Sequence, residues 1–424
     1  MDSSALVLLL LSANVYSVEI GGINYTLNYS NNTAMVISLY GVDNHYSGDI
    51  VIPSTVVFSD ETYVVTSINT GAFRDCSYLT SVEIPENVTN IGGSAFANCT
   101  QLTSINIPKG ITTLENTFQN CVNLSSITLP EGLITIGNCT FDGCTGLTDI
   151  IIPATVETIG KYAFFGCNQL LKLTIPNSVK SVGFYAFAHC EGLQQLTVGN
   201  GVNAWGEDSN TSYYGMCFSS CISLSSIHFE EGLRSISNGA FNNCTSLTSI
   251  IIPQSIERME YCPFSSCDNL ISVTVKSEDP NDITLINQAF SNASNATLYV
   301  PIGCKAAYET TNYWKDFKEI IEVQKCATPT ISFVGGKLHF ACETEGVTFH
   351  YSVTTPTFDD GTGNDISLSS NYIIKVYATK DDYVDSDVAS TVINVAGIKG
   401  DVNQDGKVSI TDAVSVVNII LGNE

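Results

Sequence analysis

Charged residues are scarce in this sequence, and basic residues are the scarcest. Asp, Glu, Lys and Arg together make up 14% of the chain, where about 25% is usual. The 42 acidic residues outnumber the 17 basic ones, which gives a net charge of −25. A nucleic-acid-binding surface needs clustered basic side chains, so we expect no nucleic-acid partner. An anionic membrane surface would also repel this chain.

Apolar runs long enough to cross a membrane are missing as well. The run from Ala5 to Leu11 is too short for a membrane span, so we expect no membrane insertion. Small and polar residues follow it, which is typical of a secretory signal cleaved near Ser17, although no Lys or Arg precedes the run. We interpret residues 1–17 as a signal peptide of a secreted or cell-surface protein. A buried N-terminal strand is the alternative.

Catalytic motifs are a third absence. The chain has no His-Glu-x-x-His, no Gly-x-Ser-x-Gly and no phosphate-binding loop. Its five histidines are scattered, at positions 45, 189, 228, 339 and 350. We therefore expect a protein that is not an enzyme.

What the sequence has is a repeat built on Phe-x-x-Cys. Successive cysteines of this motif are 23, 22, 23, 23, 23, 31, 23 and 23 residues apart. A fixed period in this range indicates a solenoid of stacked coils. The motif cysteines are Cys76, Cys99, Cys121, Cys144, Cys167, Cys190, Cys221, Cys244 and Cys267.

Each repeat reads as one coil with a strand and a return segment. Ile105 and Ile107 alternate with polar residues, which predicts a strand with one buried face. Pro108 ends that strand, and Ile111 and Leu114 turn the chain back over the core. One coil cannot bury its own apolar face, so the coils must stack with equivalent residues in register.

This unit resembles the BspA-like (Treponema-type) leucine-rich repeat of bacterial and protist surface proteins. The resemblance covers residues 67–293, with residues 18–66 similar to the N-terminal cap of that family and residues 294–322 to its C-terminal cap. It implies a non-enzymatic adhesin or interaction scaffold. Its ligands would be proteins or glycans, with host matrix proteins among the candidates.

The motif cysteines form one column in the stack, and we interpret them as buried thiols. A disulfide ladder would pair them two by two, and nine is an odd number. A metal string would favour closely spaced Cys or His ligands, and no Cys-x-x-Cys occurs. Three further cysteines, Cys139, Cys217 and Cys262, lie just before the Phe of their repeats and are interpreted as packing variants.

The outward strand residues form two nearly uncharged columns. Either these are ordinary exposed strand residues, or they form a broad binding surface, as the concave faces of the family imply. The candidate ligand contacts are Asn106, Thr128, Thr174, Thr197 and His228. The full columns are Ser81, Ser104, Ser126, Asp149, Lys172, Gln195, Ser226, Ser249 and Ser272, and Glu83, Asn106, Thr128, Ile151, Thr174, Thr197, His228, Ile251 and Thr274.

The 31-residue interval contains an insertion with three aromatic residues. Insertions in repeat proteins form loops, often on the binding face, and exposed aromatics are good contacts for proteins and sugars. Trp205, Tyr213 and Tyr214 are therefore candidate ligand contacts. The alternative is that they pack onto their own coil.

The repeat stops before residue 323. Residues 323–396 alternate apolar and polar residues between turns, which predicts a small β-sandwich. It resembles the Ig-like and chitobiase C-terminal-like modules of secreted bacterial proteins. Cys326 and Cys342 are candidates for a disulfide between its first two strands, although sequence alone does not show that they are close.

Residues 397–424 contain oxygen ligands at the spacing of a calcium loop, followed by a short helix. The ligand set is Asp401, Asn403, Asp405, the Lys407 carbonyl, Ser409 through a water molecule, and Asp412. Gly406 provides the sharp turn that such a loop requires, so we expect Ca²⁺ as cofactor. The chain as a whole is thus predicted to be a β-rich leucine-rich-repeat solenoid, followed by a small β-sandwich and a C-terminal calcium loop-helix.

This tail resembles one dockerin type I repeat, which implies docking to a cohesin-type scaffold. Two features depart from the family: the repeat is single, and Ile410 and Thr411 stand where the family has its cohesin contacts. The alternative function is therefore an accessory, non-catalytic component of a polysaccharide-degrading complex, tethered through this tail.

Overall fold

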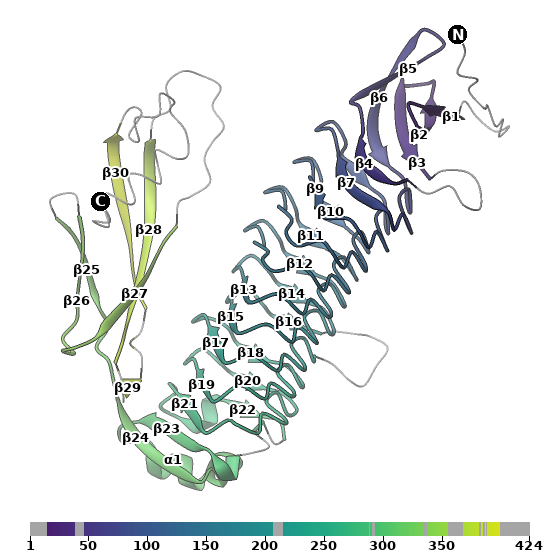
Figure 1. Ribbon diagram of the computed structural model, residues 1–424. Coiled ribbons are helices and arrows are strands. Elements are labelled where there is room, and N and C mark those ends of the chain that lie inside the picture. Colours follow the sequence, from purple (N-terminus) through teal and green to yellow (C-terminus); the bar gives the residue numbers. More distant parts are fainter. Residues whose placement is uncertain are drawn as a thin grey trace. The chain divides into compact units, whose positions relative to one another are not determined.

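The computed structural model divides into two compact units (Figure 1). One comprises Met1–Tyr299 and Ala306–Ile320, and the other Val300–Lys305 and Ile321–Glu424. The structure describes residues 15–38, 46–206, 215–287, 289–290, 293–334, 337–354, 368–380, 383–384, 386 and 388–398. The predicted calcium loop and most of the predicted signal peptide lie outside these residues.

The first unit begins with a twisted sheet in the order β1-β2-β3-β6-β5. The strands β1, β2 and β3 are antiparallel, and β3 then pairs in parallel with β6. Ser17 pairs with Thr26 inside β1, so cleavage near Ser17 would cut within this strand. Tyr25 and Tyr63 are fully buried under the sheet. The strands are β1 (Val15–Ile20), β2 (Ile23–Asn28), β3 (Thr33–Ile37), β5 (Thr55–Phe58) and β6 (Glu61–Ile68).

The repeat coils contribute parallel strands to one side of the solenoid. Along each strand, outward-facing residues that reach solvent alternate with buried residues, as the sequence pattern predicts. An isolated bridge between Ser126 and Asp149 lies between the first two of the three sheets. These sheets are β4 (Gly48–Val51), β7 (Leu79–Glu83) and β9 (Ser104–Ile105); β13 (Lys172–Ile175), β15 (Gln195–Val198) and β17 (Ser226–Phe229); and β19 (Ser249–Ile252), β21 (Ser272–Val275) and β23 (Thr297–Pro301).

The return segments form a second set of parallel strands, most of them two residues long. Their second residue is an apolar side chain that points into the core, such as Leu114 in β10 and Ile136 in β11. The strands are β8 (Asn90–Ile91), which pairs with β6; β10 (Thr113–Leu114), β11 (Thr135–Ile136), β12 (Thr158–Ile159), β14 (Ser181–Val182) and β16 (Ala204–Trp205); and β18 (Ser235–Ile236), β20 (Arg258–Met259) and β22 (Thr284–Leu285).

A column of stacked phenylalanine rings fills the turn side of the core. Successive ring centroids are 4.9 to 5.7 Å apart, and the planes of neighbouring rings differ by 20° or less. The column continues to Phe290, one coil beyond the last Phe-x-x-Cys motif. Its members are Phe73, Phe96, Phe118, Phe141, Phe164, Phe187, Phe218, Phe241, Phe264 and Phe290. These stacked coils confirm the predicted leucine-rich-repeat solenoid.

Aromatic residues close both ends of this column. The Tyr46 ring packs against Phe73 at the N-terminal end, and its hydroxyl donates to the carbonyl of Ile37. At the other end Trp314 and Phe317 contact Phe290. The helices of this region are η1 (Pro280–Asp282), η2 (Ala293–Asn295), α1 (Lys305–Thr310) and η3 (Trp314–Asp316).

The second unit contains only strands among its regular elements from residue 321 onward, as far as the structure describes it. Ile374, Val376 and Ala378 are buried under one sheet, and the Phe340 ring lies 5.4 Å from that of Tyr351. The sandwich as a whole stays a prediction. The strands are β24 (Glu319–Lys325), paired with β29 (Tyr383–Val384); the hairpin β25 (Thr330–Val334) and β26 (Lys337–Ala341); and the antiparallel β27 (Thr348–Thr354), β28 (Leu368–Thr379) and β30 (Ala389–Ile398).

All fifteen cysteines lie in the described residues, and no disulfide joins any of them. A bridge between Cys326 and Cys342 is therefore wrong for this structure. The Cys342 thiol instead donates to the carbonyl of Ala327 at 3.0 Å.

Candidate functional site

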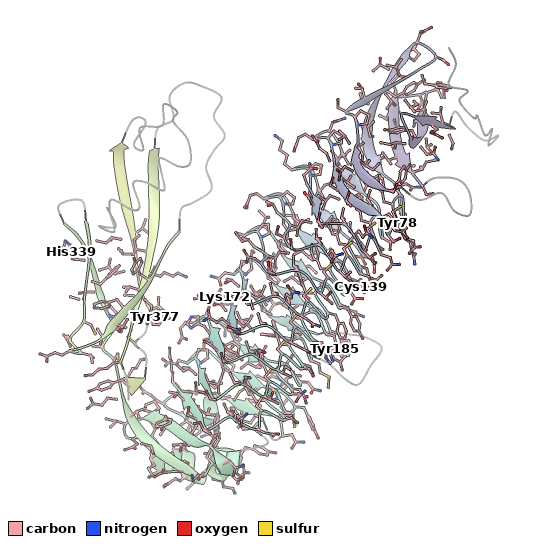
Figure 2. All side chains as sticks on the ribbon, viewed as in Figure 1. Tyr78, Cys139, Lys172, Tyr185, His339 and Tyr377 are labelled. Atoms are coloured by element: carbon pink, nitrogen blue, oxygen red, sulfur yellow. The ribbon has the colours of Figure 1, made fainter. Side chains whose placement is uncertain are left out.

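The two outward columns of strand residues are in register, as the sequence predicts. Lys172 pairs with Gln195, and Thr174 pairs with Thr197. Both columns extend beyond the repeats. In the first, Asp49 pairs with Ser81 and Thr297 with Ser272; in the second, Val51 pairs with Glu83 and Tyr299 with Thr274. We call the outward side chains of β4 to β23 the strand face, and Figure 2 labels Lys172 on it.

The strand face carries few charges and several exposed apolar side chains. Thr128 and Thr174 are exposed, and Thr197 and His228 are half-buried. Ile151, between Thr128 and Thr174 in the column, is 77% exposed. The face therefore offers hydroxyl groups together with isolated apolar contacts, a combination that suits an uncharged ligand surface.

Asn106 has a role that the sequence did not indicate. Its side-chain oxygen accepts from the Ile84 N–H, and its amide nitrogen donates to the Ile84 carbonyl, both at 2.7 Å. The strands β7 and β9 stop just before this point, so the amide replaces the backbone pairing between the two coils. Asn106 thus stabilises the stack with the groups that a ligand would otherwise contact.

Asp49 fixes the N-terminal end of the strand face. Its carboxylate accepts hydrogen bonds from the Ser81 hydroxyl at 2.5 Å and the Thr80 hydroxyl at 2.7 Å. These bonds favour the ionised form and lower the pKa of Asp49. The exposed carboxylate therefore remains ionised at neutral pH.

Trp205 is a core residue, which corrects the prediction that it is an exposed contact. Its side chain is only 4% exposed, and it pairs with Val182 in the sheet of return strands. There it continues the buried column of Leu114, Ile136 and Ile159. Its indole Nε1 is buried with no hydrogen-bond partner among the described residues. Trp205 therefore packs onto its own coil, which was the alternative interpretation of the insertion. Tyr213 and Tyr214 lie outside the described residues.

The motif cysteines are buried thiols, as predicted, and each also makes a hydrogen bond that the sequence did not reveal. From Cys99 onward, every motif thiol donates to the carbonyl of the Phe in the preceding coil, at 3.1 to 3.4 Å. Burial raises the pKa of Cys144 to about 12, and it also raises the pKa values of Cys76, Cys99, Cys121, Cys167, Cys221, Cys244 and Cys267. These thiols are consequently poor nucleophiles, and their role is to hold coils together.

No metal centre is found in the part of the chain that the structure describes. Groups of three or more His, Cys, Asp or Glu side chains suited to a metal ion are absent from these residues. The six predicted calcium ligands lie outside them. In the same residues no helix is long and apolar enough to cross a membrane.

Comparison with known proteins matches the repeats. Residues 54–117, 114–212 and 207–313 match the BspA type leucine rich repeat region, in six copies. A leucine-rich repeat protein from Bacteroides ovatus is 28% identical, and the match covers 72% of this chain and 76% of that one, with a TM-score of 0.58.

Two further solved structures are similar. A leucine rich repeat protein from T. pallidum is 28% identical over 48% of this chain and 87% of that one, with a TM-score of 0.40. A leucine rich cell surface protein from Faecalibacterium prausnitzii is 22% identical over 72% of this chain and 94% of that one, with a TM-score of 0.30. No curated protein sequence matches the chain. Because the matched repeats span more than half of its residues, the chain belongs to the BspA-type leucine-rich repeat family.

Proposed function

We propose that this protein is a secreted or cell-surface adhesin or interaction scaffold, without enzymatic activity, that binds its ligands on the strand face. One observation carries the proposal: the face runs along three successive sheets from β4 to β23, most of its outward side chains reach solvent, and few of them are charged. Interfaces are depleted of charge at their centre, and an uncharged strand surface avoids the cost of desolvating ions.

Both protein and glycan ligands fit this surface. Hydroxyl groups such as those of Thr174 and Thr197 donate and accept hydrogen bonds, and the exposed Ile151 adds apolar contact area. Host matrix proteins are candidate protein ligands for a surface adhesin. The net charge of −25 disfavours nucleic acid as a ligand.

Replacing small strand-face residues with Arg tests the proposal. The double variant Thr174→Arg/Thr197→Arg places two long charged side chains at the centre of the face. Binding of the full chain to a panel of matrix proteins and glycans should fall sharply. Thr113→Arg, at an exposed position of the return strands, is the control and should bind normally. Unchanged binding by the double variant would show that the ligand contacts another surface.

The C-terminal tail supports a second proposal, in which the protein is an accessory component of a polysaccharide-degrading complex. Its motif supplies three carboxylates and further oxygen atoms for Ca²⁺, and helix residues follow it. The partner would be a cohesin-type scaffold. Calorimetric titration of the full chain should detect one Ca²⁺ site with a dissociation constant of about 10⁻⁵–10⁻³ M, the range of extracellular modules.

Asp405→Ala should abolish this Ca²⁺ site. Capture by a cohesin in Ca²⁺, reversed by a chelator, would support tethering. If Ca²⁺ binds but no cohesin is captured, the loop is a structural site and the accessory role is wrong.

A further inference from the structure

A cluster of aromatic side chains lies at the turns of two neighbouring coils. Tyr162 and Phe165 flank the core residue Phe164, and Phe184, Tyr185 and His189 belong to the turn of the next coil. The Tyr162 and Tyr185 rings stack with centroids 5.6 Å apart, and Phe184 meets Tyr185 edge-on at 4.1 Å. The His189 ring lies 5.2 Å from that of Phe165. In Figure 2 Tyr185 lies on the opposite side of the coils from Lys172, so this cluster is separate from the strand face.

The backbone conformation at Tyr162 and Tyr185 does not favour an aromatic residue. Tyr162 and Tyr185 both have φ near +55°, at 55° and 54°. This left-handed region favours Gly and Asn, and a bulky side chain is uncommon in it. In the other coils from that of Phe73 to that of Phe264, the equivalent residue, two before the core Phe, is also left-handed but never aromatic. Those residues are Gly71, Ser94, Asn116, Cys139, Met216, Gly239 and Cys262.

Core packing does not account for the cluster either. The four Tyr and Phe rings are half-buried and His189 is exposed, so all five present surface to solvent. The core of each coil is already filled by the fully buried Phe164 and Phe187 beneath them. A group of half-buried aromatic rings with an exposed histidine at two adjacent turns is a candidate contact surface, because aromatic side chains are enriched among the residues that carry binding energy.

The chemistry of the cluster favours a sugar as occupant. The faces of aromatic rings are electron-rich and attract the polarised C–H groups on one side of a pyranose ring. Tyr hydroxyls and the His189 imidazole add the few polar groups that orient a ligand on an apolar platform. A protein contact of ordinary size would need a far larger area, on the order of 800 Å² per partner.

We propose that Tyr162, Phe165, Phe184, Tyr185 and His189 form a binding site for a neutral oligosaccharide. The net charge of −25 disfavours anionic glycans, which selects neutral ones. The proposal shares with the proposed function only the idea that the chain binds glycans, since the site lies on a different surface.

The test uses the full chain on an array of neutral and acidic oligosaccharides, followed by calorimetric titration with the best neutral binder. Tyr162→Asn/Tyr185→Asn should weaken binding by about tenfold or more, through loss of the stacking contacts. Because Asn116 occupies the same left-handed position, the melting temperature of this variant should not fall. His189→Asn is a second variant, since Asn98 and Asn120 occupy the position of His189 in their coils.

Tyr78→Gln is the matched control, because Tyr78 is a 67% exposed tyrosine on a distant coil and Gln101 occupies its position in the next coil. It should bind the oligosaccharide normally. Absence of any neutral glycan ligand, or equal binding by the wild type and the double Asn variant, overturns the proposal. A protein ligand lost only in the double Asn variant overturns it too and makes the cluster a protein contact. Loss of the glycan only in Thr174→Arg/Thr197→Arg overturns it but leaves the strand-face function standing.

Discussion

At the scale of single residues, the recurring cysteine is explained by a hydrogen bond as well as by packing. The Cys167 thiol donates to the Phe141 carbonyl at 3.3 Å, and that carbonyl also accepts from the Cys144 N–H at 3.1 Å. Each thiol therefore links its coil to the preceding one inside the core.

We expect Cys167→Ser to be more stable than Cys167→Ala. Serine keeps a donor for the Phe141 carbonyl, whereas alanine loses it, so the two variants should differ by about 0.5–1.5 kcal/mol. Chemical denaturation followed by circular dichroism measures both. A serine variant less stable than the alanine variant would show that burial of the hydroxyl outweighs its hydrogen bond.

The buried thiols also predict how stability depends on pH. Burial raises the folded-state pKa of Cys76 to about 11 and of Cys144 to about 12, above the value near 9 of an exposed thiol. The neutral thiols contribute their full stability below pH 9 and lose it as the pH rises toward 11 to 12, because only the unfolded chain then releases protons readily.

Denaturation at a series of pH values should therefore show a steep loss of stability above pH 9. Thiol reagents should label the motif cysteines slowly in the native protein at neutral pH. Rapid native labelling of most of them would contradict the prediction.

At the scale of elements, the sequence predicted the strands well because their exposed and buried residues alternate with period two. It misplaced Trp205 because the longer interval hid the register of that coil. The signal was present, since Gly206 follows Trp205 as Gly160 follows Ile159 and Gly183 follows Val182. The hydrogen bonds of the Asn106 side chain could not be predicted from the sequence, because they depend on where the strands β7 and β9 end.

Trp205 provides a test at this scale. Trp205→Ala should lower the free energy of unfolding by about 3–5 kcal/mol, since it leaves a cavity among the return strands. Trp205→Leu should cost much less, because Leu114 occupies the same column and the unpartnered indole N–H is removed. Circular dichroism during urea denaturation separates the two. An alanine variant with unaltered stability and lost ligand binding would restore the contact interpretation.

At the scale of the whole molecule, the regular spacing of the Phe-x-x-Cys motif was enough to predict the solenoid. The two caps, in contrast, could be proposed only from their resemblance to those of the family. The sequence motif ends at Phe264, but the ring column continues to Phe290, whose coil lacks the cysteine. Tyr46, Trp314 and Phe317 close the column through contacts between distant segments, which no periodicity in the sequence reveals.

Because each coil touches only its neighbours, damage to one end should stay near that end. Trp314 is fully buried against Phe290, so Trp314→Ala exposes the last coil. We expect amide hydrogen exchange to accelerate in the coils of Phe290 and Phe264, while the coil of Phe141 keeps its protection. Phe141→Ala, in the middle of the column, is the comparison and should loosen coils on both sides. Uniform loss of protection along residues 67–293 in Trp314→Ala would instead show that the solenoid unfolds as a single cooperative unit.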